Sequence, residues 1–171
     1  MYAISKGIVL SEDYQEKFHK RLSVEEVEEG ITLSPKFDEN GLIPCVTTDS
    51  TTHEVLMVGY MNAEALVKTI EVGEAFYFSR SRKAVWHKGQ TSGLTQKVKE
   101  IRIDDDQDSI WLSVDVGGAG ASCHVGYKSC FYRSIPSEKQ INLDLKLKWE
   151  EQEKIFDPKE VYGDTPNPTK L

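Results

Sequence analysis

The chain has 171 residues, of which 39% are hydrophobic and 29% are charged, and its formal net charge at pH 7 is −7. This length and composition predict one globular domain with an adequate core, and the acidic balance argues against non-specific nucleic-acid binding. No apolar run approaches the roughly 20 residues of a membrane span, and the N-terminus shows neither the basic start nor the cleavage site of a signal peptide. Three cysteines without a signal peptide then indicate thiols in a reducing cytoplasm rather than a disulfide framework.

The first part of the chain, residues 1–33, is expected to be an N-terminal extension with no chemical signal of its own. Ser11 is placed to cap a first helix. Ser23 and Glu26 have the spacing of a capping box at the start of a second helix, which Gly30 would end.

Residues 34–135 are expected to form the main domain, with an α+β fold of mostly antiparallel strands and few helices. The strands predicted by apolar alternation are, in chain order, 42–48, 54–60, 75–79, 95–103 and 110–116. The first two would form a hairpin. Asn62 and Gly73 would cap the two ends of a helix in which Leu66 and Ile70 share one face.

The later strands carry further expectations. Val98 is out of phase with the apolar residues that follow it, which predicts a β-bulge. Residues 131–133 are expected to close the core sheet. A C-terminal extension, 136–171, would follow, with a further strand where apolar residues alternate over 141–149 and with a disordered tail.

A basic segment, 79–93, stands out in this acidic chain. It brings Arg80, Arg82, His87 and Lys88 close together in the sequence, along with several hydroxyl side chains and glycines. Arginine forks, hydroxyls and backbone amides freed by glycine are what a phosphate group needs. The segment therefore favours phosphate binding over the alternative, an ordinary basic surface loop.

Four aspartates fall within five positions after the strand 95–103. Asp104, Asp106 and Asp108 alternate, so in an extended segment they would point to one side and would need a cation to offset their repulsion. Carboxylate oxygens suit Mg²⁺ or Ca²⁺. Asp105 would point the other way and is available for a different role. The alternative is an acidic turn without a metal.

Two cysteines follow a glycine-rich turn. Thiolates suit Zn²⁺, but Cys123 and Cys130 alone leave a tetrahedral site incomplete, so further ligands must come from elsewhere in the fold, from a second subunit or from water. His124 could act as a general acid or base, support a ligand, or be purely structural. Cys45, within an apolar run, is expected to be a small buried hydrophobe.

Three motifs in this order and spacing, SRSRKAVWHKGQTSG, DDDQD and SCHVGYKSCFYR, resemble those of the phosphoribosyl-AMP cyclohydrolase family. The resemblance covers residues 34–135. It implies a cytoplasmic, intertwined homodimer with a partial barrel, containing Zn²⁺ and Mg²⁺. Such enzymes hydrolyse the purine ring of 1-(5-phosphoribosyl)-AMP between N1 and C6, the third step of histidine biosynthesis.

The resemblance also implies residue roles. Magnesium would bind the three alternating aspartates, and zinc would bind Cys123, Cys130 and a third ligand across the dimer interface. Asp105 stands where the family has that third cysteine, and Val125 stands where it has a threonine. A carboxylate is a harder ligand than a thiolate, so the zinc site should shift toward harder ions.

The remaining roles concern the substrate. Proton transfer falls to His124 or His87, and the two phosphates would be held by Arg80, Arg82, Lys88 and Arg133. Two alternatives remain open at this point. One is a paralogous hydrolase of another purine nucleotide, and the other is a non-catalytic metal-binding module.

Overall fold

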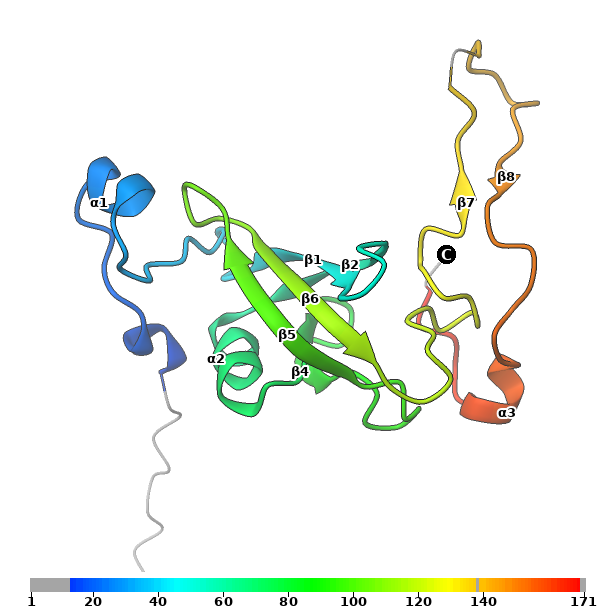
Figure 1. Ribbon diagram of the computed structural model, residues 1–171, viewed down its shortest axis with the longest axis horizontal. Helices are drawn as coiled ribbons and strands as arrows, with labels where there is room; N and C mark the ends of the chain where they lie inside the picture. Colours follow the sequence, from blue (N-terminus) through cyan, green and yellow to red (C-terminus); the bar gives the residue numbers. More distant parts are fainter. Residues whose placement is uncertain (1–12, 138, 170–171) are drawn as a thin grey trace, which may run out of the picture.

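A four-stranded sheet forms the centre of the computed structural model, which describes residues 13–137 and 139–169 (Figure 1). Its strands, in spatial order, are β2 (Val55–Met61), β1 (Ile43–Asp49), β6 (Ile110–Val116) and β5 (Gln96–Ile103). Two antiparallel hairpins, β1–β2 and β5–β6, are joined by parallel pairing of β1 with β6. The fold is therefore α+β and mainly antiparallel, as the sequence predicts, with one parallel pair that local patterns did not reveal.

A second hairpin, β3 (Phe76–Ser79) with β4 (Ala84–His87), joins the edge of the sheet. The backbone N–H of Ala75 donates to the carbonyl of Gln96 at 2.9 Å, which links the entry of β3 to β5. The basic segment 79–93 therefore combines the end of β3 and the whole of β4 with turns, rather than forming a single loop. The predicted bulge is confirmed, because the β5–β6 register shifts between Val98 and Glu100.

Helix α2 (Ala63–Val72) packs against this hairpin and has the predicted caps. The Asn62 side chain accepts the N–H of Ala65 at 2.9 Å, and Gly73 ends the helix with a φ of +74°. Leu66 is buried, whereas Ile70, four residues further along the helix, is 46% exposed. Thr69 faces the core instead, and its hydroxyl ties the helix to the backbone of Phe76.

The core lies between this helix, the second hairpin and the main sheet. The central strands of the main sheet carry apolar residues at alternating positions, as half-buried strands require. The large, almost fully buried side chains of this core are those of Tyr77, Ile43, Leu56, Met61, Leu66, Ile110, Leu112 and Val114. Cys45 is buried among them, as predicted.

The N-terminal extension carries a short 3-10 helix, η1 (Tyr14–Lys17), and α1 (Val24–Glu29). Asp13 caps η1, while Ser11, the cap expected from the sequence, lies outside the described residues. The predicted cap of α1 is confirmed, since the Ser23 hydroxyl accepts the N–H of Glu26 at 3.1 Å.

The C-terminal extension stands to one side of the main sheet in Figure 1. Strand β7 (Arg133–Ser134) pairs with β8 (Lys148–Trp149), and α3 (Pro158–Tyr162) follows. The expectations that 131–133 closes the core sheet and that 141–149 forms one strand are therefore wrong. Ile141 is 81% exposed and Leu143 is fully exposed, so no sheet face among the described residues covers this alternating segment. In the described part of the chain, no helix has the length and apolar character needed to cross a bilayer.

Candidate active site

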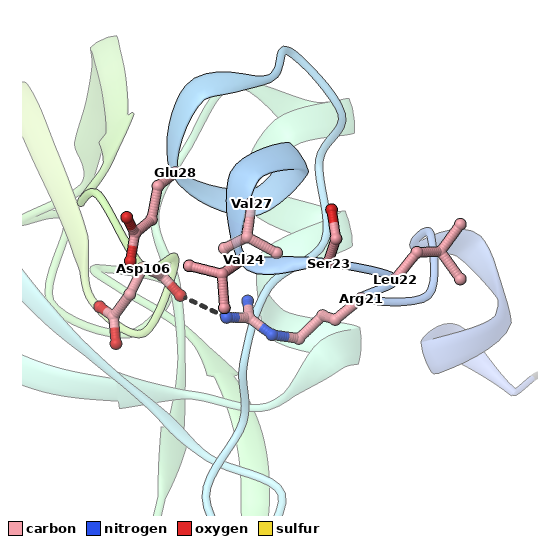
Figure 2. A pocket seen from close by; sticks show the side chains of 7 residues that line it. All are labelled: Arg21, Leu22, Ser23, Val24, Val27, Glu28 and Asp106. Atoms are coloured by element: carbon pink, nitrogen blue, oxygen red, sulfur yellow. Dashed lines mark hydrogen bonds between the residues drawn. The ribbon is translucent and has the colours of Figure 1, made fainter.

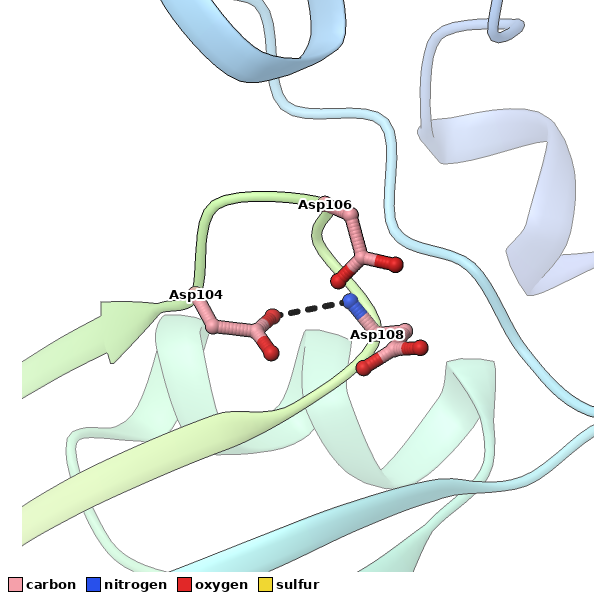
Figure 3. A group of neighbouring side chains, drawn as sticks. All are labelled: Asp104, Asp106 and Asp108. Carbon is pink, nitrogen blue, oxygen red and sulfur yellow. Dashed lines mark hydrogen bonds between the residues drawn. The ribbon is translucent and has the colours of Figure 1, made fainter.

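Three aspartates converge in the turn between β5 and β6 (Figure 3). Asp104, Asp106 and Asp108 each offer a carboxylate oxygen, and these atoms lie within 4.8 Å of one another. A tight turn rather than strand alternation brings them together. One carboxylate oxygen of Asp104 accepts the backbone N–H groups of Asp108 and Ser109, each at 2.9 Å, and Gln107 adopts a φ of +57°.

The charge of this cluster fits a hard divalent cation, because three convergent carboxylates repel one another in the absence of positive charge. Lys36 supplies part of that charge: its Nζ lies 3.6 Å from Asp106 and 3.5 Å from Asp108. The side chains of Lys36, Asp106 and Asp108 are all partly exposed, so these ion pairs are weak. The cluster can therefore accept a cation in competition with Lys36.

Gln107 fastens the N-terminal extension to this aspartate turn. Its buried side-chain amide donates to the carbonyls of Val27 and Thr32 at 3.1 Å and accepts the N–H of Ser34 at 2.8 Å. Arg21 adds a hydrogen bond of 2.8 Å to the backbone carbonyl of Asp106. Figure 2 shows this contact on the wall of an open pocket of about 420 Å³ between α1 and the turn.

The two cysteines of the third motif, Cys123 and Cys130, meet in the loop that follows β6. The backbone N–H of Cys130 donates to the carbonyl of Leu56 at 2.7 Å, and the hydroxyl of Ser129 donates to that of Val55 at 2.7 Å, so the loop is tied to β2. Cys123 is buried, whereas Cys130 reaches the surface.

A hydrogen bond between the two thiols moves their pKa values in opposite directions. A hydrogen bond from Cys130, opposed by burial and aided by the backbone amides of Val125 and Tyr127, lowers the pKa of Cys123 to about 6. The same hydrogen bond raises the pKa of Cys130. One thiolate is therefore present at neutral pH, which is the form that binds a soft metal ion.

Lys88 and His124 lie beside this pair. Burial lowers the pKa of Lys88, while the two cysteines act in the opposite direction. Burial also lowers the pKa of His124, partly offset by the Asn167 side chain and reinforced by the Lys88 charge. Among the described residues, the Nε2 of His124 is the one buried side-chain nitrogen or oxygen that lacks a hydrogen-bond partner. His124 is thus held neutral, with a ring nitrogen available.

The other candidate residues lie apart from this group. Arg80 stacks over the ring of Tyr60 with its Cζ 4.1 Å from the ring centre, at the turn of the β3–β4 hairpin. The Nε of Arg82 donates to the hydroxyl of Ser79 at 3.2 Å. Arg133 instead lies over Trp149 on the C-terminal extension.

His87 is fixed between two neighbours from the same end of the second hairpin. Its Nε2 lies 2.5 Å from a carboxylate oxygen of Glu74, and its ring stacks on Phe76 with the centres 4.4 Å apart. A histidine held against a carboxylate in this way has a defined orientation, as a proton-transfer group requires.

The aspartate turn and the cysteine loop are separate sites within one chain. Ser122, next to Cys123, accepts a hydrogen bond from the side chain of Gln96, the first residue of β5. Asp105 lies two residues beyond Ile103, the last residue of the same strand. Within residues 13–137 and 139–169, the aspartate trio is the one group of three or more potential metal ligands that converges. The thiolate pair is therefore incomplete in a single copy.

Several residues of these sites were not predicted from the sequence. Lys36, Glu74, Gln107 and Asn167 act through tertiary contacts with segments far along the chain. A glutamine between aspartates gives no local signal of a buried anchor.

Comparisons with known proteins place these motifs in a family. The family model described as "Phosphoribosyl-AMP cyclohydrolase" matches residues 57–132. A protein of that name from Rhodopseudomonas palustris (strain BisA53) is 56% identical over 138 residues, covering 81% of this chain and 92% of its own. Relatives of the same name from Bradyrhizobium diazoefficiens and Nitrobacter winogradskyi are 52% and 49% identical, covering 80% and 82% of this chain and 94% of each relative.

Proposed function

The chain belongs to the phosphoribosyl-AMP cyclohydrolase family, and we propose on this premise that it hydrolyses 1-(5-phosphoribosyl)-AMP between N1 and C6, a step of histidine biosynthesis. The observation that carries the proposal is the high identity to enzymes of that name over nearly their whole length. Of the two alternatives considered from the sequence, a different purine nucleotide or a non-catalytic metal module, neither gains support from these comparisons.

Two metal ions would complete the site. The aspartate trio suits Mg²⁺, since its oxygens are hard and convergent. The thiolate pair suits Zn²⁺, with Asp105 of a second copy as the third ligand. Bound zinc would supply the activation that water needs to attack C6.

The reaction can be balanced with the residues of this chain. The water oxygen bonds to C6, the C6–N1 bond breaks, and the two water protons go to N1 and to the exocyclic nitrogen. His124 is neutral and has an available nitrogen, so it can accept a proton from water and return it to N1. His87, oriented by Glu74, is the second candidate for this transfer.

The phosphate groups of the substrate would bind the basic side chains. Arg80 and Arg82 lie exposed at the turn of the β3–β4 hairpin and can offer their guanidinium forks. Lys88, beside the cysteines, would meet a phosphate near the reacting ring. Arg133 lies on β7, which pairs with β8 of the C-terminal extension, and would contribute from there.

We further propose that the protein is a cytoplasmic homodimer. The support for a dimer is the incomplete thiolate pair, because Asp105 lies at the other end of β5 from the loop that holds Cys123. The support for the cytoplasm is the metabolic role of the family and the use of free thiols.

The test is the ultraviolet spectrum of 1-(5-phosphoribosyl)-AMP incubated with the pure protein, Zn²⁺ and Mg²⁺. Ring opening changes the chromophore, so the spectrum should shift with time and stop shifting after chelation of the metals. No shift despite bound metal would contradict the proposal and favour the non-catalytic module. Turnover of another purine nucleotide alone would favour the paralogous hydrolase.

A further inference from the structure

A segment of the C-terminal extension, residues 150–156, lies against the cysteine loop; we call it the strap. The backbone N–H groups of Glu150 and Glu151 reach the carbonyl of Tyr132 at 2.9 and 3.3 Å. Further along, the N–H of Ile155 donates to the carbonyl of Gly126, between the two cysteines, at 2.8 Å. The cysteine loop is thus contacted near both ends of the strap.

The carboxylate of Glu151 makes the strongest of these contacts. One of its oxygens accepts the backbone N–H of Lys128 at 2.8 Å, and the other accepts that of Ser129 at 2.9 Å. Hydrogen bonds to an ionised acceptor are about twice as strong as neutral ones. These two amides immediately precede Cys130, so Glu151 fixes the backbone that carries the second thiol.

Gly126 shows how close the strap comes to the loop. Its φ is +104°, and a Cβ built there would lie within 2.4 Å of the carbonyl oxygen of Phe156. A side chain at this position would clash with the strap and strain the backbone. The close approach of the strap to the loop therefore requires glycine at position 126.

Glu151 is not itself a metal ligand in this arrangement. In the part of the chain described, the aspartate trio is the only group of three potential metal ligands that converges. Glu151 and the two cysteines therefore do not form a second group of this kind. Its charge nevertheless influences the pKa values of both Cys123 and Cys130, so it lies close to them. Its two oxygens are occupied by backbone amides, which is the arrangement of a residue that orients ligands from outside the metal site.

We infer that Glu151 is a positioning residue for the thiolate pair, and that the strap makes the C-terminal extension a working part of the metal site. This inference rests on the proposed zinc site. It assigns to the extension a role that its sequence did not indicate: holding the two sulfurs at the spacing that one metal ion needs.

Three variants test the inference. Glu151→Gln keeps the shape but replaces one acceptor oxygen with a donor, and Glu151→Asp keeps the charge but withdraws both oxygens by one methylene. Glu153→Gln, on the same strap and exposed, is the matched control. Zinc affinity is measured by chelator competition, Mg²⁺ affinity by titration, and exchange of the Lys128 and Ser129 amides by NMR, all on the full chain.

Both Glu151 variants should bind zinc about ten- to a hundredfold more weakly, as changes outside the ligand set of metal sites do. Their Mg²⁺ affinity should be unchanged, and the two amides should exchange faster. Wild-type zinc affinity in Glu151→Asp would overturn positioning in favour of a simple charge effect. Equal loss of zinc and Mg²⁺ binding would overturn it in favour of general destabilisation. If the wild-type protein binds no zinc, the proposed zinc site fails instead.

Discussion

Asp105 precedes strand β6 and Cys123 follows it, so the two residues lie beyond opposite ends of this strand although they fall within one stretch of sequence. Figure 1 shows that the turn before β6 and the loop after it leave the strand at opposite ends. The seven residues of β6 span about 20 Å at the usual rise per residue. A single chain therefore does not bring this carboxylate and this thiol onto one metal ion. If both bind the same ion, as the family resemblance implies, they come from two copies of the chain.

The arginines of the second hairpin should affect binding more than chemistry. Arg80→Ala and Arg82→Ala should each raise KM by about tenfold or more with a smaller change in kcat, because each removes a charged hydrogen bond to a phosphate. Arg102→Ala is the control, since Arg102 is exposed on β5 and pairs with Glu100. Steady-state kinetics decide the matter, and an unchanged KM in both variants would leave these arginines as ordinary surface residues.

The hydrogen bond between Cys123 and Cys130 predicts a pH dependence. In metal-free protein the thiolate of Cys123 forms as the pH rises through about 6, so its alkylation by iodoacetamide should increase across that range. Cys130→Ala removes the hydrogen bond that lowers this pKa, so the midpoint should move up. Cys45 will not interfere, because burial raises its pKa to about 12. A wild-type midpoint near the ordinary value of 9.0 would refute the lowered pKa of Cys123.

The main strands and the helix were predictable because their signals are local. Asn62 and Gly73 mark the ends of α2, and the irregular phase of Val98 marks a bulge. The parallel pairing of β1 with β6 was not predictable, since it joins residues far apart in the chain.

The site residues also fall into those that local sequence signals predict and those that depend on distant contacts. The aspartates and cysteines could be identified from their residue types and their spacing in the sequence. Gln107 and Glu151 do not, because each acts through hydrogen bonds to the backbone of a distant segment. The alternation over 141–149 misled for a related reason: an alternating pattern gives a strand only where a sheet face is present to cover it.

Lys36 should compete with the cation at the aspartate turn. Lys36→Met should bind Mg²⁺ more tightly, by up to about fivefold, because an exposed ion pair contributes at most about 1 kcal/mol. Lys99→Met is the control, since Lys99 pairs with Asp115 away from the turn. Titration calorimetry measures both. Weaker Mg²⁺ binding in Lys36→Met would mean that Lys36 supports the site rather than competing for it.

Asp105 should determine the metal preference of the thiolate site. Asp105→Cys should tighten zinc binding and retain activity, because a thiolate is the softer ligand. Asp105→Ala should lose both, and harder ions such as Mn²⁺ should compete better in the wild type than in Asp105→Cys. Chelator competition on the three proteins provides the comparison. Wild-type zinc affinity in Asp105→Ala would reduce Asp105 to part of an acidic turn.

Subunit complementation tests most directly that the hydrolytic site is built from two chains. Two differently tagged copies are co-expressed and the mixed dimer is purified, with Asp105→Ala in one chain and Cys123→Ala in the other. One of its two sites then has all its ligands, so it should show about half of the wild-type cyclohydrolase activity. A mixed dimer of a wild-type chain with a chain carrying both substitutions should be inactive. The opposite pattern, an inactive first dimer and a half-active second, would place the complete site within a single chain and contradict the shared site.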